Sequence, residues 1–425
     1  MNGPAACPLR SAHSGTGTEP PALSAVTSSA DPGAVYRELR EKRGIVARVE
    51  LEPGVFAWLV MGYRELLAVT RQERLFSRDS RNWHDLNDGV VPPHSELLRM
   101  MSWRANVVGA DGPEHRRLRA PLDEGIAGID QRGTRLRVGA VCTELIEDLA
   151  GRGRADLVNE YALIVPMLAL ASLFGMDDQE GRELRNALEA LSALFSDTGD
   201  AAVGRRHFEQ ILLDTLRARE RAPADDLTTA FLRHPNLESE TERVQSMAAM
   251  IMAGNESIAA WIAHTLRLML TDARFAAQVH GGRLGVDDAL DEALWRDPPM
   301  SNMPARFARR DTELGGQTIR RGDVLILGIA AAHDDPAVRP DDSVEGLGNR
   351  AHLAFSAGPH ACPARVPARL ITRTAVNTVL HLLPDMKLTV PAGDLVWRPS
   401  PWARIPVALP VEFSTAGIPR APARH

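Results

Sequence analysis

The stretch Phe355–Ala364 reads FSAGPHACPA and runs into a helical pattern over Pro363–Leu383. A thiol at this place points toward backbone N–H groups and the positive end of a helix dipole, and both favour the thiolate. Gly358 permits a tight turn or a close approach of the backbone to a flat ligand. A lone cysteine is more often a small buried hydrophobe. Spacing alone therefore leaves a structural and a functional role open for Cys362.

Length and composition exclude several classes of protein. The chain has 425 residues, of which 44% are hydrophobic and 24% charged, the balance of a globular protein with a large core. A net charge of −6 argues against a protein that binds nucleic acid by neutralising many phosphates. The 3 cysteines (Cys7, Cys142 and Cys362) are too few for a disulfide scaffold or a Cys-rich zinc domain, and they suit a reducing cytosol.

The ends of the chain and its longest apolar run bear on localisation. Residues 1–30 are rich in Gly, Ala, Pro, Ser and Thr and lack the basic and apolar regions of a signal peptide. We expect them, and residues 416–425, to be flexible tails. The apolar run Ala162–Met176 is shorter than the ~20 residues that span a membrane, and Pro166 interrupts it. The expected localisation is cytoplasmic.

Helical periodicity dominates the chain, with apolar residues three and four positions apart. A pattern over Glu238–Leu270 would span ~50 Å as one helix. Its middle, Met247–Trp261, is apolar on most of its circumference, which predicts burial. Further helices are predicted over Leu136–Leu149, Leu184–Phe195, His207–Arg219 and Asp287–Arg296.

Two segments predict β structure. Apolar and polar residues alternate in Glu313–Ile329, which also carries turn signals. Leu388–Phe413 has the pattern of short strands. No linker divides the chain. The predicted fold class is mainly α with a minor β region, in one large domain over residues 31–415.

The cysteine loop resembles the haem-binding loop of the cytochromes P450. The pattern is Phe-x-x-Gly-x-His-x-Cys-x-Ala, carried by Phe355, Gly358, His360, Cys362 and Ala364, where the family usually has Gly at the last position. The resemblance implies the P450 fold, a single domain that encloses haem b, with Cys362 as the proximal thiolate ligand of iron. Thiolate ligation favours O–O cleavage. By the same resemblance, His360 reaches a haem propionate.

The centre of the long helix carries a second match. Ala253–Ser257, AGNES, is similar to the oxygen-activation segment of the family, Ala/Gly-Gly-x-Asp/Glu-Thr. The resemblance places Ala253 and Gly254 beside the haem and makes Glu256 and Ser257 catalytic, as a proton relay in a dry pocket. Ser in place of Thr keeps the hydroxyl but loses the methyl that restricts χ1. Without the cysteine loop, a buried helix with one Ser bonded to its own backbone would be the simpler interpretation.

Two further segments match the family in order and spacing. Asp111–Arg119 resembles the bacterial segment Asp-Pro-Pro-Glu-His-x-x-Leu-Arg, and His115 and Arg119 share one helix face as donors for a haem propionate. Arg306 is by resemblance the partner of the other propionate. A solvated basic helix face and a surface arginine are the alternatives. The resemblance covers roughly residues 31–413.

One helix departs from the family. Its Glu-x-x-Arg motif reads Glu292-Ala-Leu-Trp295 here, and Arg296 stands one residue late, roughly 100° around the helix. In the family the Glu–Arg pair holds the irregular segment before the cysteine loop, and here Ala337–Asn349 lacks the usual Phe and an obvious arginine. We expect Trp295 to pack against that segment, since apolar groups can replace a buried ion pair. Haem binding should survive, and the tryptophan marks an atypical subfamily.

Position relative to these motifs predicts a substrate pocket. It would be apolar with a few amides, suited to an aromatic or peptide-like small molecule. Methionines and aromatic residues are also common in cores. The expected lining residues are Met100, Trp103, Val107, Ala249, Met252, Asn302, Met303 and Trp402.

The resemblance implies a monooxygenase or oxidase of secondary metabolism. It would use O2 and electrons from a ferredoxin and ferredoxin reductase, with no nucleic-acid or membrane partner. The basic residues that would dock the acidic partner are Arg116, Arg117, Arg365 and Arg369.

Two alternatives stay open. The first is oxidative C–C or C–N coupling of aromatic units such as tryptophan-containing cyclodipeptides, which the weaker relay at Ser257 would favour. The second is a non-catalytic haem protein or a partner-binding relative, which the change at Trp295 motivates. The substrate itself is not identified by the sequence.

Overall fold

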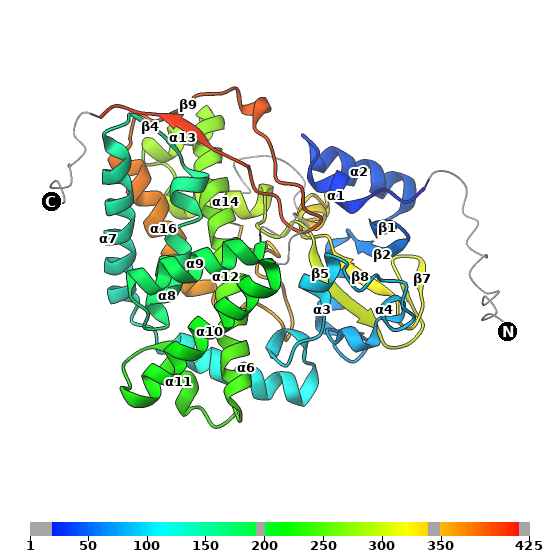
Figure 1. Cartoon of the computed structure of the whole chain (residues 1–425). Coiled ribbons are helices and arrows are strands. Elements are labelled where there is room, and N and C mark those ends of the chain that lie inside the picture. The colour runs from blue at the N-terminus through cyan, green and yellow to red at the C-terminus, as the bar shows by residue number, and fades with distance from the viewer. Residues whose placement is uncertain (1–18, 193–199, 339–348, 416–425) are drawn as a thin grey trace.

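The chain folds into a large helical part and a smaller part that holds most of the β structure, side by side (Figure 1). The computed structural model describes residues 19–192, 200–338 and 349–415. The helices of the larger part are α6 Gly112–Ala127, α7 Gln131–Ala150, α8 Val165–Leu173, α9 Asp178–Ser192, α10 Asp200–Arg221, α11 Leu227–Arg233, α12 Glu240–Thr271, α13 Ala273–His280, α14 Val286–Arg296 and α16 Arg365–Leu382. The others are α1 Leu23–Thr27, α2 Pro32–Arg43, α3 Tyr63–Arg71, α4 His84–Asn87, α5 Leu97–Met101 and α15 Ile329–His333.

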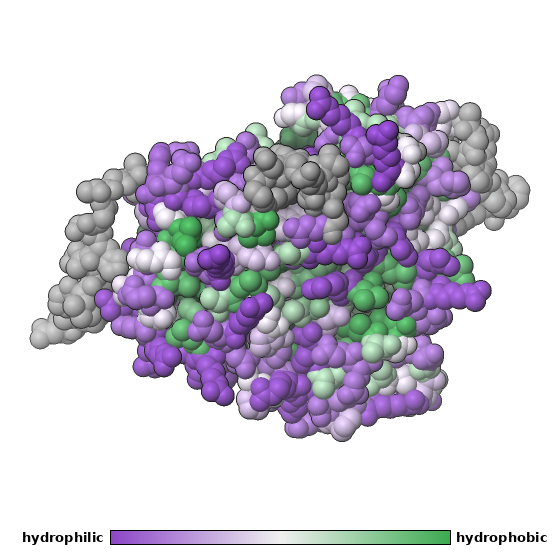
Figure 2. Space-filling model, turned by 180° about the vertical axis from the view of Figure 1, so that it is seen from behind, coloured by the Kyte–Doolittle hydropathy of each residue, from purple (hydrophilic) through white to green (hydrophobic). Residues whose placement is uncertain are grey.

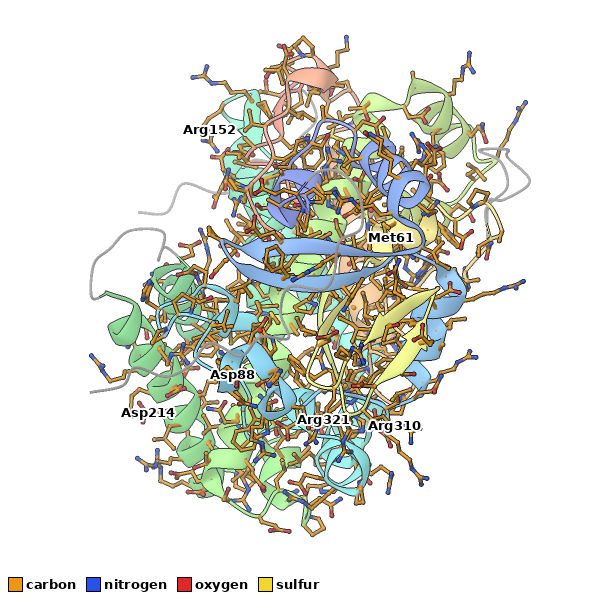
Figure 3. All side chains as sticks on the ribbon, turned by 90° about the vertical axis from the view of Figure 1, so that its right-hand side faces the viewer. Met61, Asp88, Arg152, Asp214, Arg310 and Arg321 are labelled. Atoms are coloured by element: carbon orange, nitrogen blue, oxygen red, sulfur yellow. The ribbon has the colours of Figure 1, made fainter. Side chains whose placement is uncertain are left out.

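The main sheet joins strands that are far apart in the sequence, in the order β1-β2-β8-β5-β3. Its strands are β1 Val46–Glu52, β2 Val55–Val60, β3 Phe76–Ser77, β5 Met303–Ala308 and β8 Val324–Leu327. β1 and β2 form an antiparallel pair, seen from the side in Figure 3 with Met61 just beyond β2. β2 runs parallel to β8, whereas β5 is antiparallel to both β8 and β3.

Small sheets complete the β structure. β4 Arg154–Asp156, β10 Pro410–Glu412 and β9 Lys387–Leu388 pair in the order β4-β10-β9. β6 Thr312–Leu314 and β7 Gln317–Ile319 form a hairpin. The architecture is mainly α with a minor β region in a single domain, as predicted.

α12 is the central helix. The Ser239 hydroxyl caps its first turn by accepting the N–H of Glu242 at 3.1 Å. Its second half shares one hydrophobic core with α7, α14 and α16. The Trp261 indole N–H donates to the Leu290 carbonyl of α14 at 2.9 Å, because a buried indole needs an acceptor. The predicted long helix is therefore confirmed.

The other predicted helices are confirmed as α7, α9, α10 and α14. The end of the Leu184–Phe195 prediction, residues 193–195, lies outside the described residues. Pro166 does not interrupt its helix. It stands in the first turn of α8, where a missing N–H costs no intrahelical bond.

The β predictions are partly wrong. Glu313–Ile329 holds β6, β7 and β8, but Ile329 already begins α15. Within Leu388–Phe413, the described strand residues are Leu388 and Pro410–Glu412. The prolines between them (Pro391, Pro399, Pro401 and Pro406) lack the N–H that a ladder needs.

The predicted N-terminal boundary at residue 30 is also wrong. Residues 23–27 form α1, and Leu23 and Val26 are buried in the same core as Tyr36. These side chains supply the apolar burial that offsets the ordering entropy. Residues 1–18 and 416–425 lie outside the described part of the chain.

None of the described helices is long and apolar enough to cross a membrane. The face shown in Figure 2 is mainly hydrophilic, with apolar residues gathered in separate patches.

Candidate functional site

Cys362 lies in the loop directly before α16, and the loop closes on itself. The Cys362 N–H donates to the Phe355 carbonyl at 2.9 Å. Gly358 has a φ of +70°, and a Cβ there would lie 2.2 Å from the Thr70 carbonyl oxygen of α3. Only glycine meets both requirements. This glycine therefore permits the close approach of two backbone segments.

Phe355 fixes the loop against the central helix. Its ring meets Trp261 of α12 at a centroid distance of 5.6 Å and an interplanar angle of 75°. The Arg365 guanidinium lies 5.2 Å from the centre of the Phe355 ring. Because Phe355 also bonds the Cys362 N–H, its packing determines where the thiol lies relative to α12.

The pKa of Cys362 reflects opposing influences. Burial raises it, whereas the Ala364 N–H bonded to the sulfur and the charges of Arg119 and Arg365 lower it. The net pKa is raised. The N–H and the cations act in the direction expected from the helix start, but desolvation of the thiol outweighs them. A metal ion on the sulfur supplies positive charge that reverses this balance.

A basic cluster, defined as Arg78, His115, Arg306 and His360, lies beside the cysteine loop. His115 of α6 and His360 of the loop have ring centroids 4.0 Å apart. Arg306 lies on β5, and Arg78 directly follows β3, which pairs with β5. Asp111 is the acidic neighbour, with Oδ1 3.7 Å from His360 Nε2 and 3.0 Å from the Arg78 backbone nitrogen.

The basic cluster holds more positive charge than Asp111 neutralises. Burial lowers the pKa of Arg78 to about 10 and that of Arg306 well below its usual value. Burial, with Arg306 and Arg78, also lowers the pKa of His360 to about 3, although Asp111 opposes this. Burial would raise the pKa of Asp111, but the nearby His360 and the hydrogen bonds from Ser77 and the Arg78 backbone bring it down to about 2.

The basic cluster fits an anionic ligand. Three of its nitrogens, His115 Nε2, Arg306 Nη2 and His360 Nε2, are buried with no hydrogen-bond partner among the described residues. Buried donors nearly always have partners, so a ligand with two carboxylates, such as haem, suits them. Glu73 lies within 4.8 Å of both imidazoles, as a metal site requires, but Arg78 and Arg306 disfavour a cation there.

Sequence reasoning missed Arg78 and placed Arg119 differently. Arg78 joins the basic cluster because Ser77 pairs with Phe307, next to Arg306. No local signal marks such long-range pairing. Arg119 instead donates to the Pro359 carbonyl at 3.1 Å and to Asp123 at 2.7 Å. It therefore contacts the backbone of the cysteine loop.

The AGNES segment faces open space in the middle of α12. Ala253 and Glu256 are exposed although Ile251 and Ile258 beside them are buried. Burial nevertheless raises the pKa of Glu256, while the charges of Arg99 and Arg398 oppose it. Protein groups therefore surround this carboxyl although solvent reaches it. A Cβ on Gly254 would lie 3.2 Å from Leu170, so this side of the segment packs on α8.

The residues expected to line a substrate pocket are spread over different environments. Met100 and Trp103 are 43% and 41% exposed, and Arg81 stacks on the Trp103 ring at 4.4 Å. Ala249 and Met252 of α12 are partly buried, as is Met303 at the start of β5.

Val107, Asn302 and Trp402 are core residues. Val107, in the turn Val107–Gly109, packs with Leu118 and Met247, and Trp402 packs with Tyr36. The Asn302 amide accepts from the Tyr36 hydroxyl at 3.1 Å and donates to the Pro401 carbonyl at 3.0 Å. These side chains are engaged in the fold, and their role as pocket lining stays a prediction.

The four arginines expected to dock a partner divide into two pairs. Arg117 is bonded to Glu114 and Glu242, and these acids raise its pKa above the usual value. Arg369 is paired with Asp287 and Asp291. Internal ion pairs therefore occupy both. Arg116 and Arg365 are exposed.

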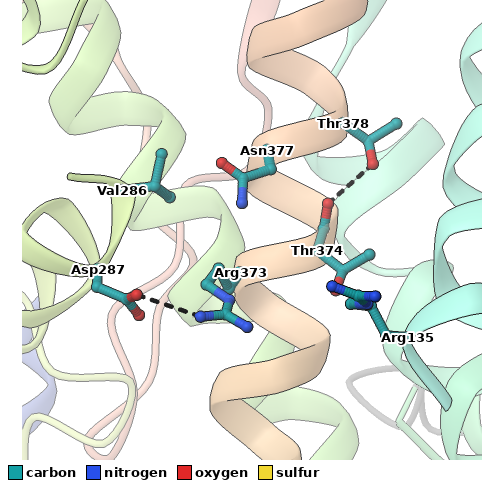
Figure 4. A pocket seen from close by; sticks show the side chains of 7 residues that line it. All are labelled: Arg135, Val286, Asp287, Arg373, Thr374, Asn377 and Thr378. Atoms are coloured by element: carbon teal, nitrogen blue, oxygen red, sulfur yellow. Dashed lines mark hydrogen bonds and ion pairs between the residues drawn. The ribbon is translucent and has the colours of Figure 1, made fainter. Parts of the chain in front are cut away.

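A surface pocket of about 540 Å³ lies away from these features, between α7, α14 and α16 (Figure 4). It is polar, and Arg373 in its wall pairs with Asp287 at 3.3 Å. None of the predicted site residues lines it.

Trp295 lies against the described end of the irregular segment, as expected. Its indole N–H donates to the Asn349 carbonyl at 2.6 Å, and its ring lies 4.8 Å from His333 and 6.0 Å from His352. Residues 339–348 of that segment lie outside the described residues. The contact is partly polar, since the indole supplies a hydrogen bond.

Known proteins resemble this chain over most of its length. No protein-family model matches it. The 2-hydroxy-5-methyl-1-naphthoate 7-hydroxylase of Streptomyces carzinostaticus is 26% identical over 382 residues, 86% of this chain and 91% of that protein. The cytochrome P450 monooxygenase PikC of Streptomyces venezuelae is 28% identical over 417 residues, 95% and 97% of the two chains. The solved structure of CYP154A1 from Streptomyces coelicolor A3(2) matches with a TM-score of 0.80 and 26% identity, over 91% and 98%.

The fold, the cysteine loop and these matches are those of haem-thiolate oxidoreductases. The chain is similar to bacterial cytochrome P450s over most of its length. Proteins of this family carry haem with a cysteine thiolate as iron ligand, and haem is the cofactor of this chain.

Proposed function

We propose that this P450 is a monooxygenase that acts on an aromatic or peptide-like small molecule of secondary metabolism. The observation that carries the proposal is the set of unpartnered buried nitrogens beside the cysteine loop, together with the raised pKa of Glu256 on the central helix. The first fits the carboxylates of haem, and the second fits the delivery of a proton.

The haem site is assigned from the described contacts. Cys362 is the iron ligand, and the basic cluster holds the propionates through charge-assisted bonds. Phe355 and Gly358 fix the loop, Ala364 donates its N–H to the sulfur, and Ala253 and Gly254 border the distal side. Bound haem supplies O2 activation with the push of a thiolate ligand.

Glu256 and Ser257 are assigned to proton delivery. Because the pKa of Glu256 is raised, this carboxyl holds a proton at higher pH than an ordinary glutamate. Ser257 follows it on α12 and offers a hydroxyl that both accepts and donates. A carboxyl and a hydroxyl on neighbouring residues of one helix can together relay a proton.

The substrate is assigned only by class. Met100, Trp103, Ala249, Met252 and Met303 provide apolar surface for a flat ring system. The naphthoate hydroxylase among the relatives acts on such a substrate. Substrate-induced shifts of the haem Soret band, screened over aromatic and cyclic-peptide metabolites, test this class.

A ferredoxin is proposed as the electron donor, and Arg116 and Arg365 are the exposed cations left to dock it. The decisive experiment combines purified protein, ferredoxin, ferredoxin reductase and a Soret-active compound, and measures product mass. Addition of oxygen supports monooxygenation, whereas loss of hydrogen with dimer formation shows oxidative coupling. A thiolate haem spectrum without turnover on any donor would favour the non-catalytic alternative.

A further inference from the structure

Asp291 of α14 receives cations from both sides of the cysteine loop. Its carboxylate is 2% exposed. Arg350, before the loop, places Nε 3.0 Å from Oδ2, and Arg369, after the loop on α16, is ion-paired with Oδ1. His352 Nε2 lies 3.7 Å from the same carboxylate. One buried acid thus joins the chain entering the loop to the chain leaving it.

Two short chains of side-chain contacts connect Asp291 with the cysteine loop. The His352 ring lies 5.8 Å from the Phe355 ring, the first residue of the loop. The Arg369 guanidinium lies 5.5 Å from the centre of the Trp261 ring, which meets Phe355 edge to face. Because Phe355 accepts the Cys362 N–H, any displacement of these partners moves the thiol.

We propose that Asp291 is the positioning residue of the cysteine loop, and that with Trp295 it performs the anchoring role that the Glu-x-x-Arg motif performs in other members. This rests on the proposed role of Cys362 as iron ligand. Asp291 and Trp295 are four residues apart and share one face of α14. From that face Asp291 binds Arg350 and Trp295 donates to Asn349, so both hold the segment just before the loop.

Glu292 and Arg296 are also four residues apart on α14, and they form an ion pair at 2.5 Å. Arg296 bonds Asp272 as well, at 3.1 Å, at the start of α13. The one-residue shift of the arginine therefore gives Arg296 a partner at α13, while Asp291 and Trp295 contact the segment just before the cysteine loop.

The test compares Asp291→Asn with the matched control Asp226→Asn. Asp226 is another ion-paired carboxylate, 4% exposed and paired with Arg219 of α10, so each change neutralises one such acid without altering its size. Arg369 keeps its second partner, Asp287, at 3.3 Å, so Asp291→Asn should fold. Breaking a buried ion pair is strongly destabilising. We expect amide hydrogen exchange across residues 349–364 to quicken by roughly tenfold or more in Asp291→Asn.

Haem spectroscopy gives the second readout. In Asp291→Asn, a share of the holoprotein should lose the reduced-CO Soret band of a thiolate-ligated haem, while Asp226→Asn keeps this band even if its global stability in urea falls equally. Arg350→Gln is the milder variant, since its side chain is 67% exposed. It should quicken exchange in the same peptides, and combining it with Asp291→Asn should add little further exchange.

The proposal is overturned if Asp291→Asn keeps both wild-type exchange in residues 349–364 and the full thiolate band. It is equally overturned if Asp226→Asn reproduces both changes, because the effect would then be that of any buried ion pair. Failure of the proposed function looks different: Cys362→Ser would keep the thiolate band, whatever Asp291→Asn does.

Discussion

Arg306 allows a test in which haem-free and haem-bound protein respond in opposite directions. Its side chain is 2% exposed, Nη1 donates to the Ala305 carbonyl at 3.1 Å, and Nη2 has no partner among the described residues. Burial and the neighbouring Arg78 lower its pKa well below the usual value. A buried charge with so little compensation destabilises the fold that holds it.

We predict that Arg306→Met raises the free energy of unfolding of the haem-free protein by about 1–4 kcal/mol. Replacing a buried charged group with an apolar side chain of similar volume is often stabilising by this amount. In the holoprotein the same change removes a hydrogen bond between charged groups, about 1.5–3 kcal/mol. Haem loss should therefore quicken roughly 10- to 100-fold.

Urea unfolding of haem-free protein and haem transfer to an excess of a scavenger protein measure the two effects. Arg320→Met is the matched control, because Arg320 is 60% exposed and pairs with Asp311 at the surface. It should change the free energy of unfolding by less than about 0.5 kcal/mol. The reasoning is refuted if Arg306→Met destabilises the haem-free protein, or if haem loss keeps the wild-type rate.

Three further predictions follow from single positions. Gly358→Ala places a Cβ 2.2 Å from the Thr70 carbonyl at a φ of +70°, so unfolding free energy should fall by about 2–4 kcal/mol and purified protein should lack haem absorbance. Burial lowers the pKa of His264 to about 4, so the unfolded state binds more protons below pH ~6.5 and stability should fall by about 3 kcal/mol between there and pH ~4. His264→Gln, which keeps a donor for the Arg404 carbonyl, should flatten this slope in urea titrations. Ser257→Ala should lower the product formed per electron consumed by about tenfold, and Ser257→Thr should raise it.

Local patterns predicted much of this molecule. The cysteine loop is contiguous, so its residues could be assigned to one ligand site before any tertiary contact was known. α12 followed from its periodicity. Arg78 could not be predicted in the same way, because it reaches Arg306 through the pairing of Ser77 with Phe307.

Burial determines other properties that local patterns do not report. The pKa of Cys362 depends on how closely the fold surrounds the thiol, and a helix start alone reports only the favourable N–H contacts. Asn302 and Trp402 occupy positions adjacent to matching motifs, yet Tyr36 and the Pro401 carbonyl engage them in the core. Adjacency in sequence says little about which way a side chain points when strands from distant segments meet.

The charges on α14 explain why a motif can change while the contact it serves remains. A helix presents a new face with each residue, about 100° apart, so moving a cation from position 295 to 296 gives it different neighbours. Here Arg296 forms an ion pair with Asp272. The face shared by Asp291 and Trp295 contacts the segment before the loop. What the cysteine loop requires is an anchor on that face. A buried carboxylate and an indole N–H satisfy the requirement as well as a Glu–Arg pair, and a pattern written only on positions 292 and 295 does not detect them.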